Sequence, residues 1–164
     1  MKSIELISCA ALAFVLGTGV GFDAMAQETP ANKETTFTLR VARPTDNLPE
    51  VVKFYRDGLG LEVLSSFNGD GNGFEGVILG HKRSPYHLEF THQSGHKVGK
   101  APTQDNLLVF YIPDRAEWTR AVERMQKNGY KPVKSYNPWW DDSGKTFEDI
   151  DGYRVVLFNT SWDR

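Results

Sequence analysis

The feature of this sequence that most restricts its fold is an order of predicted elements that occurs twice. Alternating apolar and polar residues indicate half-buried strands, while apolar residues at helical spacing indicate helices. The first half predicts a helix over 48–55 and strands over 36–41, 61–67, 74–80 and 86–91. The second half predicts a helix opened by Asp114 and strands over 107–112, 130–136, 145–150 and 153–159. Both halves follow the order strand, helix, strand, strand, strand, at a spacing of roughly 70 residues.

This order predicts an α+β fold in which two βαβββ modules make one domain over residues 36–160. The first module covers about 36–91, a linker covers 92–106, and the second module covers about 107–160. Residues 27–35 are polar and predict a flexible lead-in to the domain.

The first 26 residues predict a secretory signal peptide. Lys2 precedes an apolar run from Leu6 to Val20, and Ala24-Met25-Ala26 supplies the small residues of a cleavage site. Cleavage after this triplet makes Gln27 the new N-terminus and leaves no membrane segment, so we expect a secreted or periplasmic protein. The only cysteine, Cys9, lies in the removed segment, and disulfides therefore cannot stabilise the mature chain.

The charge balance excludes one class of partner. The chain carries 19 Lys and Arg against 21 Asp and Glu, which gives a formal net charge of −2. A generic nucleic-acid-binding domain needs a basic surface that neutralises phosphates. We therefore expect no nucleic-acid partner.

Three segments together resemble the vicinal oxygen chelate (VOC) superfamily. Val51 to Val63 is similar to its first-helix signature, Tyr86 to Phe90 to the fourth strand of its first module, and Asp149 to Leu157 to the end of its second. Val41 to Thr45, which reads Val-Ala-Arg-Pro-Thr, resembles a subgroup of small bacterial proteins within it. The superfamily includes glyoxalase I, extradiol dioxygenases, and bleomycin- and fosfomycin-resistance proteins.

The resemblance implies that the two modules form a curved mixed sheet around a cup, the glyoxalase/bleomycin-resistance fold. Side chains alternate between the two faces of a strand, so the faces can be assigned from the sequence. In the first module this alternation directs Arg40, His87, Glu89 and Thr91 toward the cup. We expect these residues to contact a ligand.

The ligand positions that the resemblance implies argue against the standard metal centre. Metal-dependent members take their ligands from the first and fourth strands of each module. Glu89 matches one of the four positions, and the others fall at Thr36 (or Arg40), Leu107 and Val156. Leu and Val carry no N, O or S donor for a divalent cation. We therefore expect no resident cofactor.

Glu89 has three further interpretations. In an apolar cup it would be a catalytic general acid or base. With Arg40 nearby it would instead form a structural ion pair. A divalent metal also stays open as an alternative, because Glu89 shares a strand face with His87 while His92 and His96 follow in the linker.

The second half offers aromatic and basic candidates for ligand binding. Alternation directs Tyr111, Arg154 and Phe158 into the cup. Trp139 and Trp140 lie in a predicted polar loop, where a ring could stack on a flat or cationic ligand. Because adjacent residues point oppositely on a strand, we expect at most one of the two to touch a ligand.

The sequence therefore predicts an exported VOC-fold protein that binds a small organic ligand in its cup without the standard metal. Arg40 would neutralise an anionic group of the ligand, and Trp139 or Trp140 would stack on it. Two alternatives remain open: a metal-dependent or Glu-dependent lyase, isomerase or dioxygenase, and a non-catalytic partner of another envelope protein. A homodimer also remains open, with the modules paired within one chain or swapped between two.

Overall fold

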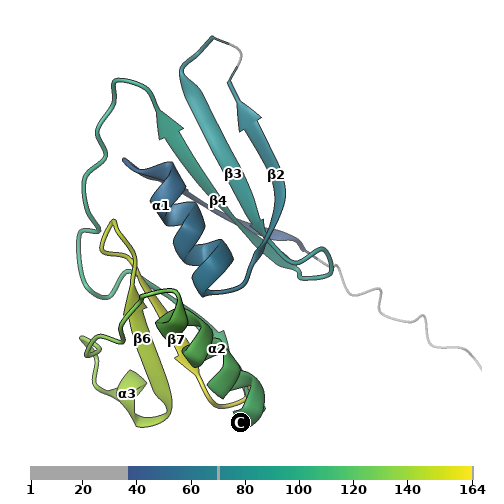
Figure 1. The fold of residues 1–164 in the computed structure, drawn as a ribbon, viewed down its shortest axis with the longest axis vertical. Coiled ribbons are helices and arrows are strands. Elements are labelled where there is room, and N and C mark those ends of the chain that lie inside the picture. The colour runs from purple at the N-terminus through teal and green to yellow at the C-terminus, as the bar shows by residue number, and fades with distance from the viewer. Residues whose placement is uncertain (1–36, 70, 164) are drawn as a thin grey trace, which may run out of the picture. The chain divides into compact units, whose positions relative to one another are not determined.

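The structure is a computed structural model that describes residues 37–69 and 71–163 (Figure 1). The predicted signal peptide, the lead-in over 27–35 and Thr36 lie outside the described residues. No helix in the described part of the chain combines the length and the hydrophobicity that a membrane crossing requires.

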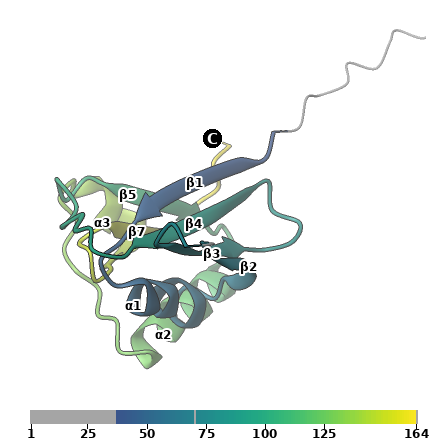
Figure 2. The same ribbon diagram turned by 90° about the horizontal axis from the view of Figure 1, so that it is seen from above.

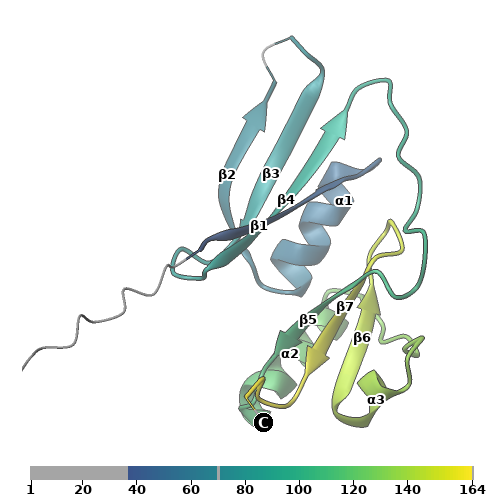
Figure 3. The same cartoon turned by 180° about the vertical axis from the view of Figure 1, so that it is seen from behind.

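The first module is a four-stranded sheet with one helix. Its elements are β1 (Leu39–Pro44), α1 (Leu48–Lys53), the π-helical turn η1 (Phe54–Gly58), β2 (Glu62–Asn68), β3 (Phe74–Gly80) and β4 (Tyr86–Gln93). The strand order is β1-β4-β3-β2, with β1 parallel to β4 and the other pairs antiparallel. In Figure 1 α1 lies in front of this sheet, and in Figure 3 the strands lie in front of α1. One face of the sheet is therefore covered by the helix.

The second module is a three-stranded sheet with two helices. Its elements are β5 (Leu107–Tyr111), α2 (Arg115–Lys127), α3 (Trp139–Ser143), β6 (Gly144–Glu148) and β7 (Arg154–Phe158). The strand order is β5-β7-β6, with β5 parallel and β6 antiparallel to β7. Figure 2 shows α1 and α2 on the same side of the strands. The opposite faces of both sheets correspond to the predicted cup face, and we use that name below.

Both main helices begin where the sequence supplies an N-cap. The Asn47 side chain accepts a hydrogen bond from the Glu50 backbone N–H, and the Asp114 side chain accepts one from the Glu117 N–H. Such side chains satisfy backbone donors that a helix N-terminus leaves free. The Asp46 side chain, one residue before Asn47, instead accepts hydrogen bonds from the Val98 and Gly99 backbone N–H groups of the linker.

The hydrophobic core lies between the helices and the sheets. Leu88 and Phe90 of β4 are 2% exposed and turn toward the helix side, as their alternation with His87 and Glu89 predicts. The remaining core is contributed mainly by α1, η1, α2, β6 and β7, with Val51, Phe54, Tyr55, Met125, Phe147, Val155 and Leu157 fully or almost fully buried.

The two modules meet through their helical segments. Arg124 of α2 donates from Nε to the Gly58 carbonyl at 3.0 Å, and Asn128 donates to the Asp57 carbonyl at 3.0 Å. The Phe54 and Tyr130 rings pack edge to face with centroids 4.8 Å apart. These contacts tie α2 and the residues after it to η1.

The observed fold is of the predicted α+β class, with the strands in two mixed sheets, but two predicted strands differ. The predicted strand over 130–136 is reduced to one bridge between Val133 and Thr146, since Pro132 has no N–H to donate to a ladder. β1 begins at Leu39 rather than at 36, and Phe37, expected to be half-buried, is 79% exposed.

The segment around Trp139 also differs from its prediction as a loop. It forms the short helix α3, which begins after Pro138. Proline is compatible with a helix start because its fixed φ suits the helix and its missing N–H would be unpaired there. The helical backbone changes the relative directions of the Trp139 and Trp140 side chains from those expected in an extended segment.

Candidate functional site

Arg40, His87 and Glu89 come together on the cup face of the first module. The parallel register aligns Arg40 with His87, and Glu89 lies two residues further along β4 on the same face. Arg40 Nε donates to His87 Nε2 at 3.1 Å, and Arg40 Nη1 donates to Glu89 Oε2 at 2.8 Å. The Arg40 side chain is 51% exposed, whereas that of Glu89 is 14% exposed. A guanidinium is thus held by two side chains of β4 and remains open to solvent.

The Arg40 contacts define which nitrogen of His87 carries a proton. A guanidinium N–H can only donate, so His87 Nε2 must accept with its lone pair. The proton of the neutral ring therefore lies on Nδ1. The ion pair with Glu89 matches the structural interpretation of that carboxylate, while its predicted role as an acid or base stays a prediction.

The donor set on this face does not fit a divalent metal. His87 Nε2 and Glu89 Oε2, the two atoms that would coordinate a cation, are both occupied by the Arg40 guanidinium. Within residues 37–69 and 71–163, no three His, Cys, Asp or Glu side chains form a group that could hold a metal ion. The alternative that recruits His92 and His96 is not assembled. His92 was expected in the linker but lies at the end of β4, and its Nδ1 donates to the Thr45 carbonyl at 3.0 Å.

Thr91 lies on the same face of β4 as His87 and Glu89, one further alternation along the strand, and it is half-buried. It is aligned with Pro44 of β1 and with Gly76 of β3. Because neither neighbour carries a polar side chain, the Thr91 hydroxyl is not used by them. Thr91 therefore extends the polar strip of this face.

The aromatic candidates form a second group, on the second module. Phe158 is 2% exposed, and its ring centroid lies 4.9 Å from that of Trp139, 5.3 Å from that of Trp140 and 5.9 Å from that of Tyr111. Trp162, which is 78% exposed, packs edge to face on Tyr111. We call these five residues the aromatic cluster. The two tryptophans were expected to diverge, but both contact Phe158 because α3 places them over the same ring.

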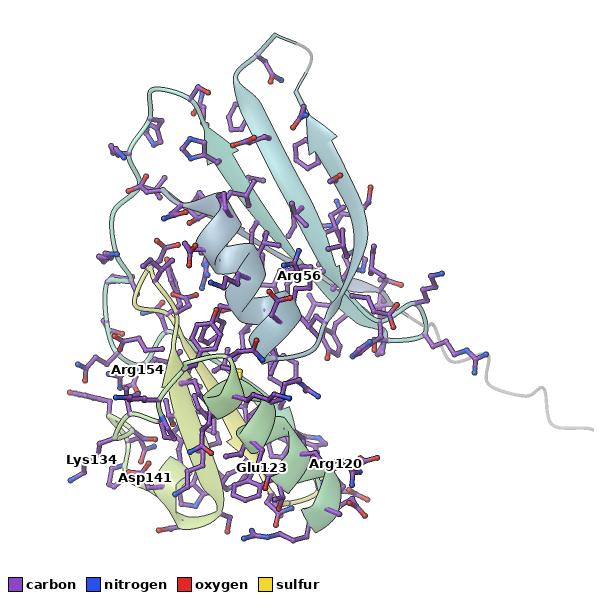
Figure 4. The ribbon with its side chains drawn as sticks, in the orientation of Figure 1. Arg56, Arg120, Glu123, Lys134, Asp141 and Arg154 are labelled. Carbon is purple, nitrogen blue, oxygen red and sulfur yellow. The ribbon has the colours of Figure 1, made fainter. Side chains whose placement is uncertain are left out.

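Arg154 occupies the predicted face of β7, but its charge is already paired. Arg154 is 5% exposed. Its Nε donates to Glu148 Oε2 at 2.8 Å, and its Nη1 donates to the Lys134 carbonyl at 3.4 Å. Figure 4 shows Arg154 on the sheet of the second module, with Lys134 and Asp141 in the segment beside it. A ligand would have to compete with Glu148 for this guanidinium.

A cavity of about 510 Å³ lies between β1 and β5, the edge strands of the two sheets. Its lining includes Arg43, Tyr153 and Arg154, together with Asn106 and the apolar side chains of Phe90 and Leu107. Its volume is in the range of small-molecule pockets. Arg154 is the one predicted ligand-binding residue in this lining, so the cavity is distinct from the Arg40 group.

Arg43, which the sequence analysis did not single out as a site residue, anchors one side of this cavity. Its Nη2 donates to Asp149 Oδ2 at 2.5 Å, and the Tyr55 hydroxyl donates to the same oxygen at 3.1 Å. The guanidinium also stacks on Tyr153, with Cζ 3.9 Å from the ring centroid, and on Phe90 at 4.9 Å. We call Arg43, Tyr55 and Asp149 the inter-module clamp.

Burial and neighbouring polar groups shift the pKa of Arg43, a member of the inter-module clamp, in opposite directions. Burial acts to lower the pKa of Arg43, but its interactions with Tyr55 and Asp149 outweigh burial and raise that pKa. Burial raises the pKa of the Tyr55 phenol far above its ordinary value. Arg43 therefore stays charged and Tyr55 stays protonated, as a hydrogen-bond donor to Asp149 must be.

The sequence did contain signals for the clamp. Arg43 is the central residue of the Val41 to Thr45 motif, and Asp149 begins the segment Asp149 to Leu157. The first segment resembles a subgroup and the second resembles the superfamily, but local patterns could not show that a charge from one is buried against the other.

Comparison with known proteins agrees with the superfamily resemblance. Residues 39–91 match the model of the YycE-like N-terminal domain, and residues 105–159 match that of the YycE-like C-terminal domain. The YycE protein of Bacillus subtilis strain 168 is 41% identical over 122 residues, which cover 74% of this chain and 87% of that protein.

Solved structures give the same result. A crystal structure of a YycE protein of unknown function from Bacillus subtilis superposes with a TM-score of 0.70 at 40% identity, over 77% of this chain and 91% of that one. The trypanothione-dependent glyoxalase I of Leishmania major superposes with a TM-score of 0.60 at 22% identity, over 77% and 88%. The second likeness shows the fold alone. The chain is thus a VOC-fold protein and belongs to the YycE-like family.

Proposed function

We propose that this protein binds a small organic anion on the cup face of its first module, through Arg40 and without a metal ion. The observation that supports this most directly is the anchored but exposed Arg40 guanidinium. His87 and Glu89 use its Nε and Nη1 groups, and half of the side chain remains exposed. The outer Nη2 edge is then available to a ligand.

The chemistry of the guanidinium suggests the class of ligand. A planar guanidinium presents parallel N–H donors that match the two oxygens of a carboxylate or phosphonate. Glu89 compensates part of the charge but also fixes the direction of Arg40, which lowers the entropy lost when the ligand binds. In this proposal Glu89 orients Arg40 and does not act as a base.

Trp139 supplies the proposed apolar surface for the rest of the ligand. It is 40% exposed, and its ring packs against Trp140 and Phe158. Rings held in this way lose little freedom when an aromatic ligand stacks on them. We therefore propose that the ligand carries an aromatic or flat apolar group in addition to its anionic group.

A matched set of probes tests the proposal. Benzoate and phenylphosphonate carry both groups, whereas benzamide has the shape of benzoate without its charge. The two anions should raise the melting temperature of the purified protein, because a ligand that binds only the native state stabilises it. Benzamide should not. If neither anion binds, or if benzamide binds as well as benzoate, the proposed ligand class is wrong.

Variants of Arg40 locate the site. A charge-assisted hydrogen bond contributes about 1.5–3 kcal/mol, so Arg40→Ala should weaken benzoate binding about 10- to 100-fold in titration calorimetry. Arg120→Ala removes an equally charged side chain from the outer face of α2 (Figure 4) and should leave the affinity unchanged. Equal affinities in Arg40→Ala and the wild type would place the anion elsewhere.

The same preparations separate the alternative functions. Conversion of a bound compound into a product, lost in Glu89→Gln, would favour a Glu-dependent enzyme over a binding protein. If a second protein co-purifies with the wild type but not with Arg40→Ala, that result would favour the alternative that this chain is a non-catalytic partner of another envelope protein. Sedimentation of the same samples measures whether the protein is a homodimer.

We also propose that the protein is exported through residues 1–26. The support is the sequence pattern of Lys2, the apolar run and the Ala24-Met25-Ala26 triplet. An extracytoplasmic protein would meet its small-molecule ligand outside the cytosol, without a disulfide in its mature chain.

A further inference from the structure

We propose that Asn72, in the turn between β2 and β3, is a site of spontaneous deamidation that converts it to aspartate and isoaspartate. Three asparagines of the chain are followed by glycine, namely Asn68, Asn72 and Asn128. Hydrogen bonds of a strand end and of a helix end restrain the first and the third. The inference concerns the covalent chemistry of the chain, so it is independent of the proposed ligand.

The reaction requires only the asparagine, the next backbone nitrogen and water. That nitrogen attacks the side-chain carbon Cγ, and the amide nitrogen leaves as ammonia, with the proton of the attacking N–H, while a cyclic succinimide forms. Water then opens the ring at either carbonyl and gives aspartate or isoaspartate. The sum is one water consumed and one ammonia released, without an oxidant or reductant. A following glycine favours the attack because it has no side chain to restrict the backbone.

The surroundings of Asn128 oppose this reaction, although the residue is exposed. Asn128 Nδ2 donates to the Asp57 carbonyl at 3.0 Å and to the Arg124 carbonyl at 2.9 Å. The Gly129 N–H donates to the Gln126 carbonyl at 3.0 Å, in the bend that ends α2. Other groups thus hold both the leaving and the attacking nitrogen, so all three hydrogen bonds must open before the ring can close.

The sheet restrains Asn68 in a similar way. Asn68 is the last residue of β2 and is aligned with Glu75 of β3. The Gly69 N–H, which would have to attack, donates to the Phe74 carbonyl. This bond belongs to the closure of the hairpin, so the attack requires local unfolding of the sheet end.

Asn72 lies in the turn itself and is exposed. Its Oδ1 accepts a hydrogen bond from the Phe74 backbone N–H at 3.0 Å, the one side-chain hydrogen bond that the described residues give it. That bond polarises the Cγ carbonyl, which is the group under attack, and does not hold the leaving nitrogen. Exposed turns also open locally at little cost in free energy. The hydrogen bonding therefore distinguishes Asn72 from the other two asparagines.

The isoaspartate product should disturb the contact between this turn and the end of β4. Isoaspartate continues the chain through Cγ, which adds one methylene to the backbone before Gly73. The Gly73 carbonyl accepts from the N–H of Ser94, the residue after β4, at 2.9 Å. We expect this bond to be lost. Either product also adds one negative charge to the formal net charge of −2.

Peptide mapping of the folded protein tests the proposal. During incubation in mildly alkaline buffer, a mass gain of one unit should accumulate at Asn72, and part of the product should accept enzymatic methylation of isoaspartate. Asn128 should react at least about tenfold more slowly, because its three hydrogen bonds must open first. If Asn68 or Asn128 reacts as fast as Asn72, or if no isoaspartate forms at Asn72, the inference is wrong.

Two controls separate the structure from the local sequence. In urea the three asparagines should react at similar rates, and an unchanged difference there would show that the hydrogen bonds are not its cause. Asn72→Ser is the matched variant, since a hydroxyl can still accept from the Phe74 N–H but cannot deamidate. Its Ser94 amide signal should survive an incubation that depletes this signal in the wild type. Equal loss in both proteins would contradict the assigned consequence.

Discussion

Arg43 of β1 forms an ion pair with Asp149, the residue that follows β6, and so connects the two modules across 106 positions of sequence. The Arg43 side chain is 12% exposed and that of Asp149 is fully buried. The other Asp149 oxygen accepts from the backbone N–H groups of Asp151 and Tyr153. Asp149 thus shapes the turn between β6 and β7 and presents its charge to the first module.

Loss of Arg43 should strongly destabilise the protein. Removal of one partner of a buried pair leaves an uncompensated charge, which costs about 3–5 kcal/mol. Arg43→Met should lower the free energy of unfolding by that amount in urea melts. Arg56→Met is the matched control, because it removes an exposed ion pair with Asp57 and should change stability little. Similar effects in the two variants would show that the clamp does not join the modules energetically.

The attachment of the linker to the first module should depend on pH. Asp46 accepts hydrogen bonds from the Val98 and Gly99 N–H groups at 2.9 and 3.1 Å, and these bonds lower its pKa from the ordinary value of 3.8. A carboxyl group with a lowered pKa stabilises the folded state above its ordinary pKa. That contribution is lost as the pH falls through the lowered folded value.

NMR titration of the Val98 and Gly99 amides checks this dependence. Their shifts should report a midpoint below 3.8, and Asp46→Asn should abolish the transition. A midpoint at or above 3.8 in the wild type would show that the two amides do not stabilise the Asp46 carboxylate.

Two glycines with the same backbone conformation should respond differently to alanine. Gly60 has φ +89° and Gly129 has φ +88°, a region in which a side chain costs about 1–2 kcal/mol. A Cβ at Gly60 would lie 2.6 Å from Arg124 Cζ, whereas one at Gly129 would meet nothing within 4 Å. Gly60→Ala should therefore cost more, because it also displaces Arg124 from the Gly58 carbonyl.

The Arg124→Ala background makes this comparison specific. With the guanidinium absent, Gly60→Ala and Gly129→Ala should lower the melting temperature by similar amounts. If Gly60→Ala remains the more harmful of the two in that background, the close approach of Arg124 is not the cause.

The exported protein should begin at Gln27. Ala24 and Ala26 would supply the small residues that a signal peptidase requires at the −3 and −1 positions. Intact mass measurement of the protein recovered from the periplasm or medium gives the start directly. Recovery of a soluble exported form that retains residues before Gln27 would refute the predicted cleavage.

The polar part of the candidate site was predictable from the sequence because it depends on one local rule. Alternation along β4 puts His87 and Glu89 on one face, and a parallel β1 brings Arg40 alongside them. The VOC resemblance implied that both strands line the cup, whereas their parallel pairing comes from the structure. The sequence could not give the two hydrogen bonds of Arg40, since these require the register between β1 and β4.

The aromatic part was predicted less well for a physical reason. Trp139 and Trp140 were expected to point apart, which holds for an extended chain but not for α3. The strand expected over 130–136 was reduced to one bridge at Val133, beside Pro132. In both places a proline, Pro132 within the predicted strand and Pro138 just before α3, altered the hydrogen bonding that periodicity alone predicts.

The sequence by itself therefore determined the order of elements in the first module, the capping of α2 by Asp114 and the shared face of His87 and Glu89, because these depend on backbone periodicity and capping over a few residues. The superfamily was identified by the resemblance of three sequence segments. Only the tertiary structure decided which charges are paired. The partners of the Arg40–Glu89 pair are 49 residues apart in the sequence, and those of the Arg43–Asp149 pair are 106 residues apart. Each pair forms only when separate strands or modules pack together. Two arginines three positions apart on β1 thus meet different environments, one at the exposed cup face and the other in the buried contact between modules.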